Sequence, residues 1–255
     1  YPSYGTGDFR SPAYSVLQEN GSRISHFQYT SHRIFAGKDS LDPLPAVYVT
    51  DPEEAQTLEI VLTDPVSKIK LTLSYTLFRD LPVIARHAIF QNRGSQTLML
   101  ERALSASFEF PDSDFSMIQL SGAWARERYV KERPLEMGIQ SIQGLNGTCS
   151  GAEHNPFLAL ARADAGEDHG EVFGFSLIYS GNFLAQTEVT TYDLTRVMIG
   201  IHPQNFCWKL APGEAFCTPE AVLVISDQGI GKMSRVFHQL FLKHLMRGKW
   251  KNSRE

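Results

Sequence analysis

The sequence predicts an all-β protein, a large antiparallel β-sandwich that ends in a single helix. Residues 68–77 alternate without a break between apolar and polar side chains, which is the period of a strand with one buried face. Short strand-like segments recur along the chain between turn residues such as Asn and Gly, a pattern typical of stacked antiparallel sheets. Apolar residues at convincing helical spacing gather only near the C-terminus.

The strands follow one another in chain order. The pair Asn20-Gly21 lies between apolar alternations and predicts a short hairpin near the N-terminus. Apolar residues occupy both odd and even positions in 97–110, so that strand is expected to be covered on both faces. Turn residues separate the predicted strands, which are 58–63, 68–77, 83–91, 97–110, 172–179, 206–210 and 215–225.

The last predicted element is a helix over about residues 231–246, with Gly248 as its stop. A second apolar seam, Leu242 and Met246, lies on roughly the opposite side of this helix and predicts a bridge to a further domain. Leu242 and Met246 are therefore expected to be more exposed than Phe237 and Phe241. The domain boundaries follow, with a sandwich over 1–229 and a helix and linker over 230–255. The wide seam that should dock on the sandwich consists of Met233, Phe237, Leu240, Phe241 and Leu245.

The composition limits the function classes. The chain of 255 residues has 42% hydrophobic residues, 20% charged residues and a net charge of −4, so it can bury one large core. The lysine and arginine residues form no basic stripe, which argues against a nucleic-acid partner. No apolar run is long enough to predict a membrane span. The histidines and cysteines lack the spacing of a metal site, and no cofactor motif is present.

Three cysteines, Cys149, Cys207 and Cys217, are too few and too widely spaced for a disulfide framework and suit a reducing compartment. Cys207 and Cys217 flank an Ala-Pro-Gly turn at 211–213 almost symmetrically. They are expected to face each other across a hairpin without forming a disulfide, because a slip of one residue would separate them.

The first candidate site is the glycine-bracketed loop that carries Asp8 and Arg10. A carboxylate can act as a general acid or base, and Asp8 is the candidate acid that the sequence singles out. Its simpler role is a structural contact with Arg10 or with the backbone at a turn. The glycines do not form a phosphate loop, because the required lysine and spacing are absent.

The second candidate site combines Trp124 with Arg126 and its charged neighbours. An indole can stack on a sugar ring while charged groups bind its hydroxyls, and Trp and Arg are also enriched in subunit contacts. The competing interpretation, which we favour here, is a core tryptophan. Trp124 is then mostly buried, and Trp124→Ala costs about 3–5 kcal/mol.

Polar loops supply the remaining candidates, since recognition residues on a sandwich tend to lie on loops. The two loop-like stretches are 37–45 and 144–156. His154 lies in the second, before Asn155-Pro156, where it could act as a base in a sugar site or stabilise the loop.

Five segments extend the argument beyond these patterns. They are Tyr-Gly-Thr-Gly-Asp-Phe-Arg at 4–10, Leu-Ser-Gly-Ala-Trp-Ala-Arg-Glu at 120–127, His-Asn-Pro-Phe at 154–157, Tyr-Ser-Gly-Asn-Phe at 179–183 and Leu-Ala-Pro-Gly-Glu-Ala-Phe-Cys-Thr-Pro-Glu at 210–220. In this order the chain resembles the sandwich domain that precedes the catalytic barrel of family 36 glycoside hydrolases, the microbial α-galactosidases and raffinose-type hydrolases. The resemblance implies a galactose-mutarotase-like super-sandwich. It also implies that no catalytic residue lies here, because the two catalytic aspartates belong to the barrel.

The resemblance implies a parent enzyme of the bacterial cytoplasm that hydrolyses terminal α-galactosyl residues of melibiose- and raffinose-type oligosaccharides by a retaining mechanism. This domain is then expected to support the barrel, contribute to a homo-oligomer and shape the rim of a neighbour's pocket. Two other functions stay open. An autonomous carbohydrate-binding module would need an exposed aromatic platform. A mutarotase-like sugar epimerase would need a polar cleft with a His–Glu pair across a concave sheet.

Overall fold

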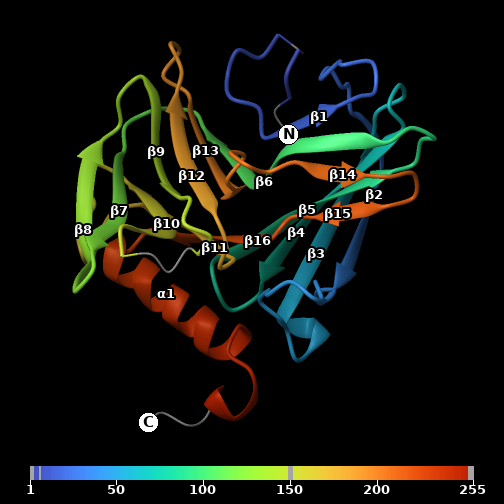
Figure 1. The fold of residues 1–255 in the computed structure, drawn as a ribbon. Coiled ribbons are helices and arrows are strands. Elements are labelled where there is room, and N and C mark those ends of the chain that lie inside the picture. The colour runs from blue at the N-terminus through green and yellow to red at the C-terminus, as the bar shows by residue number, and fades with distance from the viewer. Residues whose placement is uncertain (1–2, 6, 149–151, 252–255) are drawn as a thin grey trace.

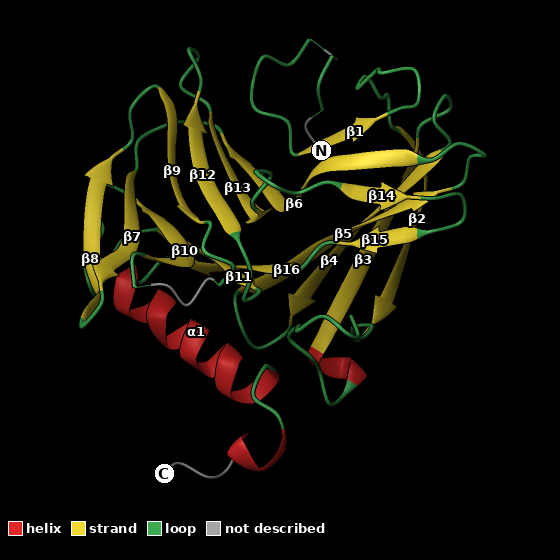
Figure 2. Ribbon diagram, in the orientation of Figure 1, coloured by secondary structure: helices red, strands yellow, loops and turns green. Residues whose placement is uncertain are grey.

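The structure is a computed structural model that describes residues 3–5, 7–148 and 152–251. Two antiparallel sheets face each other, and one long helix packs on the outside of the larger sheet (Figure 1). Strands dominate the molecule (Figure 2), so the predicted all-β antiparallel sandwich with a C-terminal helix is confirmed. Cys149 lies outside the described residues.

The smaller sheet has six strands. Its order is β1 (Tyr14–Leu17), β6 (Leu98–Phe110), β13 (Thr195–Ile201), β12 (Phe183–Val189) and β9 (Gly138–Gly144), with β14 (Trp208–Leu210) also paired to β6.

The larger sheet has ten strands and extends beyond the smaller one. Its order is β2 (Gln28–Ala36), β3 (Ala55–Thr63), β4 (Ile69–Phe78), β5 (Val83–Asn92), β16 (Glu220–Ser226), β11 (Val172–Ile178), β10 (His154–Ala161), β7 (Ser116–Ala123) and β8 (Arg126–Pro134), with β15 (Ala215–Cys217) paired to β5. A short 3-10 helix, η1 (Pro52–Glu54), precedes β3.

The middle strands of the larger sheet are buried on both faces. Alternate residues of each strand point to opposite faces and so belong to different cores. Leu158 and Leu160 of β10 pack toward the smaller sheet. Ala159 and Ala161 of the same strand pack toward helix α1 (Gly229–His244). Burial on both faces gives these strands continuous small and apolar residues in place of an alternation.

Helix α1 closes the outer core. Met233, Val236, Phe237 and Leu240 are buried in one cluster with the sheet, and the helix begins and ends two residues before the predicted bounds. Beyond the helix, Gly248 begins a short 3-10 helix, η2 (Gly248–Lys251).

The exposure predicted for the second seam holds in part. Met246 is 38% exposed, whereas Leu242 and Phe241 are both half-buried. The end of the helix is tied to the sandwich, since the backbone N–H of Tyr48 donates to the carbonyl of His244 at 2.7 Å and the Tyr48 hydroxyl donates to the carbonyl of Met246 at 2.9 Å.

Two hairpin predictions are wrong. Gly21 does form a turn, with a φ of 84°, but β1 pairs with β6 and β2 pairs with β3. Cys207 and Cys217 are both free thiols and do not face each other, because β14 joins the smaller sheet and β15 the larger. In both cases the turn connects strands of different sheets. Residues at equal distances from the turn are therefore not paired with each other.

Residues 215–225, predicted as one strand, form two. The break falls at Thr218 and Pro219, because proline has no N–H to donate to a ladder. Thr218 fills the gap, since its backbone N–H donates to the Ala88 carbonyl and its hydroxyl accepts from the Ala88 N–H, both at 2.9 Å.

Candidate functional site

The loop that carries Asp8 and Arg10 is held in one conformation by charged groups. The Asp8 carboxylate accepts the backbone N–H of Arg10 at 3.0 Å and its Nε at 2.9 Å, so the predicted Asp8–Arg10 contact is confirmed. These hydrogen bonds from Arg10, together with Arg196, hold the pKa of Asp8 well below its usual range. Gly5 and Gly7 shape the loop, since both have φ above 80°.

Arg196 anchors this loop to the smaller sheet. It lies on β13 directly opposite Glu109 of β6, and its side chain is only 1% exposed. Its Nη2 donates to Asp8 at 2.9 Å and to Glu109 at 2.6 Å. Arg10 reaches the other oxygen of Glu109 at 3.2 Å. Four charged groups therefore form one neutral, closed network where β6 ends and β13 begins.

The network holds an aromatic side chain out in solvent. Phe9 lies between the two clamped residues, Asp8 and Arg10, and its side chain is fully exposed. Exposure of a single apolar residue is ordinary, but this one lies on a segment that ion pairs fix on both sides. The arrangement therefore fixes the position of an aromatic group on the surface.

The predicted burial of Trp124 is wrong, because its side chain is 88% exposed. Trp124 and Ala125 form the two-residue turn between β7 and β8. Ala125 has a φ of 62°, a conformation that favours glycine.

Arg126 begins β8, which is the edge strand of the larger sheet. Every residue of β8 is exposed, and it lies at the far left edge in Figure 1. The one side-chain hydrogen bond described at the turn runs from the Ala125 N–H to Glu127 at 2.9 Å. An exposed edge strand with a tryptophan at its tip is a surface suited to pairing with another chain.

His154 is the first residue of β10 and not part of the loop in which it was expected. Its Nδ1 lies 2.9 Å from the Ser121 hydroxyl of β7. The ladder between β10 and β7 is irregular between His154 and Leu158, where Pro156 lacks an N–H. The structure brings His154 neither to the Asp8 network nor to Trp124 in any described contact.

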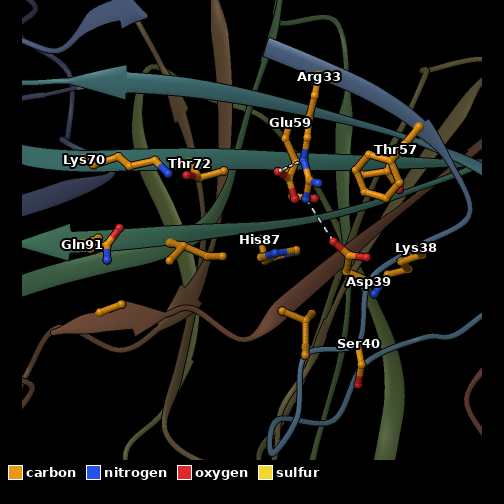
Figure 3. A pocket seen from close by; sticks show the side chains of 15 residues that line it. Arg33, Lys38, Asp39, Ser40, Thr57, Glu59, Lys70, Thr72, His87 and Gln91 are labelled. Carbon is orange, nitrogen blue, oxygen red and sulfur yellow. Dashed lines mark hydrogen bonds and ion pairs between the residues drawn. The ribbon is translucent and has the colours of Figure 1, made fainter. Parts of the chain in front are cut away.

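A polar cavity of about 380 Å³ lies on the outer face of the larger sheet, over β2 to β5. Figure 3 shows Thr72 and His87 on the strands and Lys38 and Asp39 on the loop that lines the other side. This loop is the stretch 37–45 that the sequence indicated. The alternation of β4 is real, but Thr72 and Ser74 are buried beneath the cavity and not solvated.

Ion pairs frame the cavity. Arg33 donates to Glu59 at 2.7 Å and to Asp39 at 3.1 Å. Lys38 and Glu220 form a buried ion pair at 2.7 Å, and burial raises the pKa of Glu220. Sequence reasoning did not select the pairs Arg33–Glu59 and Lys38–Glu220, because each joins distant segments whose proximity only the fold creates.

His87 is the buried titratable group at the floor of this cavity. Burial, and then the positive charges of Lys38 and Arg86, lower the pKa of His87 to about 3. Its ring is therefore neutral near pH 7. Among the described residues, no group of three His, Cys, Asp or Glu side chains could hold a metal ion, and no helix is long and apolar enough to cross a membrane.

Known proteins resemble the chain along its whole length. Residues 1–211 match the family model described as the glycosyl hydrolase family 36 N-terminal domain. The α-galactosidase AgaA of Geobacillus stearothermophilus is 49% identical over 252 residues, which are 99% of this chain and 34% of AgaA. The α-galactosidase Mel36A of Lactobacillus acidophilus is 41% identical over 99% of this chain and 34% of its own length.

Solved structures agree with this comparison. The crystal structure of AgaA superposes with a TM-score of 0.98 at 48% identity, over 100% of this chain and 35% of AgaA. Variants of AgaA have been crystallised in complex with stachyose and with raffinose. The chain therefore spans about a third of the length of these relatives.

Proposed function

The chain belongs to glycoside hydrolase family 36, as the N-terminal domain, and on this premise we propose that it is the non-catalytic part of an α-galactosidase. The substrates of that enzyme are the terminal α-galactosyl residues of melibiose- and raffinose-type oligosaccharides. One observation carries the proposal: the whole chain superposes on the corresponding third of AgaA with a TM-score of 0.98. The complexes of AgaA variants with stachyose and raffinose support the substrate class.

The described sites support a non-catalytic role. A retaining glycosidase needs two carboxylates about 5–5.5 Å apart that flank a glycosidic bond. Asp8 and Glu109 are instead bound to Arg10 and Arg196. A carboxylate in such a network makes a poor nucleophile and a poor acid, because its partners stabilise the bound anion.

We propose further that the domain supplies contact surfaces for a homo-oligomer of the parent enzyme. The β7–β8 hairpin with Trp124 and the clamped loop with Phe9 each project a highly exposed aromatic side chain. Helix α1 and Met246 would lead toward the barrel. The free thiols Cys207 and Cys217 agree with our placement of the enzyme in the bacterial cytoplasm.

The exposed Trp124 also favours the second candidate function, an autonomous carbohydrate-binding module. Stacking on a single indole would bind a sugar weakly. The epimerase is less well supported. Its histidine must exchange a proton near neutral pH, and the pKa of His87 lies at about 3.

Two measurements on the 255-residue chain test the proposed function. Incubated with a chromogenic α-galactoside, the chain should give no turnover above a matched blank. Turnover that survives repurification would contradict the non-catalytic role. In a sedimentation series over concentration, the chain should self-associate through its exposed surfaces. A monomer at every concentration would place the oligomer contacts on other parts of the enzyme.

A further inference from the structure

Four polar side chains form one row across the outer face of the larger sheet. Arg33 pairs with Glu59, Glu59 with Ser74, and Ser74 with His87, on four adjacent strands from β2 to β5. Neighbouring strands lie about 4.8 Å apart, so the backbones of Glu59 and His87 are separated by roughly 10 Å. All four side chains line the same cavity, and Figure 3 labels three of them, Arg33, Glu59 and His87.

His87 and Ser74 bring accessible polar side-chain atoms to this row, because neither residue is among those with fully buried, unpartnered polar atoms. His87 is 7% exposed and Ser74 is also buried, yet neither side chain has a described hydrogen bond. Both side chains line the cavity, so their polar atoms can hydrogen-bond to whatever fills it. A neutral imidazole offers one donor and one acceptor, and a hydroxyl offers both. The floor of the cavity is therefore suited to a ligand that carries several hydroxyl groups.

The charges of the cavity favour a neutral ligand. Arg33 is already paired with Glu59 and Asp39, and Lys38 with Glu220. Lys70 is the one cation among the described lining residues that has no carboxylate partner. An anion would have to compete with these carboxylates, whereas a polyol can add hydrogen bonds to them without disrupting the pairs.

The cavity has the size of a small-molecule site. Its volume of about 380 Å³ falls in the usual range for ligand pockets, about 300–1,000 Å³. Leu41 of the loop and Ile89 of β5 supply apolar wall between the polar groups, and sugars need both kinds of contact.

We propose that this cavity binds one neutral hexose, held by His87, Ser74 and Glu59. The inference is independent of the proposed α-galactosidase function, because it uses only this domain's own residues. The cavity binds the sugar and does not convert it, since a histidine that stays neutral over the physiological range is a poor proton donor.

The test is titration of the 255-residue chain with D-galactose and with D-glucose, followed by calorimetry and by the chemical shifts of the histidine ring nitrogens. We expect saturable binding with a Kd of roughly 1 mM and a shift confined to the His87 ring. Ser74→Ala and His87→Gln should each weaken binding about tenfold. His154→Gln is the matched control, because His154 lies on the same sheet outside the cavity, and it should bind as the unaltered chain does.

Other outcomes would overturn the proposal. Failure of both hexoses to saturate the chain is one such outcome, and binding by both variants as tight as that of the control is another. Inorganic phosphate that binds in place of both sugars would identify an anion site. Should His87→Gln fail to fold, judged by its melting transition, Ser74→Ala and the ring shifts of the unaltered chain still decide the question. A His87 ring that responds to neither sugar would mean that the cavity holds only water.

Discussion

The N-terminal loop and the β7–β8 hairpin contain the same kinds of residue and differ in what lies beneath them. Each has an exposed aromatic side chain, Phe9 or Trp124, beside arginine and a carboxylate. In the loop, every charge is bound to the buried Arg196 or to its partners. In the hairpin, the charged residues of β8 all lie in solvent. The comparison shows that charged residues on a loop take a fixed conformation when a buried partner, here Arg196 of β13, lies beneath them.

The largest expected effect comes from removing the anchor of the loop. Arg196→Met leaves Asp8 and Glu109 without their shared cation, and we expect a loss of about 2–4 kcal/mol in the free energy of unfolding. Arg126→Met in the hairpin is the matched control and should change stability by less than about 0.5 kcal/mol. Chemical denaturation measures both. Equal losses in the two variants would remove the contrast between the regions.

A smaller effect is expected from the acid side of the network. Because the pKa of Asp8 is lower in the folded chain than in the unfolded one, Asp8 stabilises the fold above its ordinary pKa and loses this contribution as the pH falls below it. Asp8→Asn should therefore flatten the decline of the melting temperature in acid and cost about 1–2 kcal/mol at pH 7. Phe9→Ala, which keeps all the ion pairs, should leave the acid decline unchanged. An identical acid decline in Asp8→Asn would show that other groups cause it.

The smallest effect on stability is expected at the hairpin tip. Trp124 buries little surface in the chain, so Trp124→Ala should alter the free energy of unfolding by less than about 0.5 kcal/mol. The same variant should weaken self-association in sedimentation, because aromatic residues dominate contact energies. A large loss of stability would restore the core interpretation of Trp124. Unchanged self-association together with lost affinity for galactose would favour the carbohydrate-binding module.

The sequence predicted the elements whose burial is periodic. Strand β4 and helix α1 were found because one side of each faces a core. Strand β8 was missed, since it is exposed along its whole length and has no apolar face. The alternation of β4 was detected, but it could not reveal that the loop at 37–45 covers the polar side.

The candidate sites were harder to predict than the strands. The Asp8–Arg10 contact is local and could be anticipated from spacing alone. Glu109 and Arg196 are 87 residues apart in sequence, and only the pairing of β6 with β13 joins them. Trp124 was misjudged because its residue type suggests burial, whereas its position in a two-residue turn decides its exposure. Residue type alone could not predict that His87 lies in one row with Arg33, Glu59 and Ser74, because strand pairing creates that row.

The most direct test of the central claim is a chimera in which this chain replaces the N-terminal third of AgaA. The claim is that the chain is the N-terminal domain of an α-galactosidase and acts by supporting the rest of the enzyme. The account predicts that the chimera hydrolyses raffinose within about tenfold of the rate of AgaA rejoined at the same junction. A chimera that folds, shown by its melting transition, but gives no turnover while rejoined AgaA is active would contradict the claim.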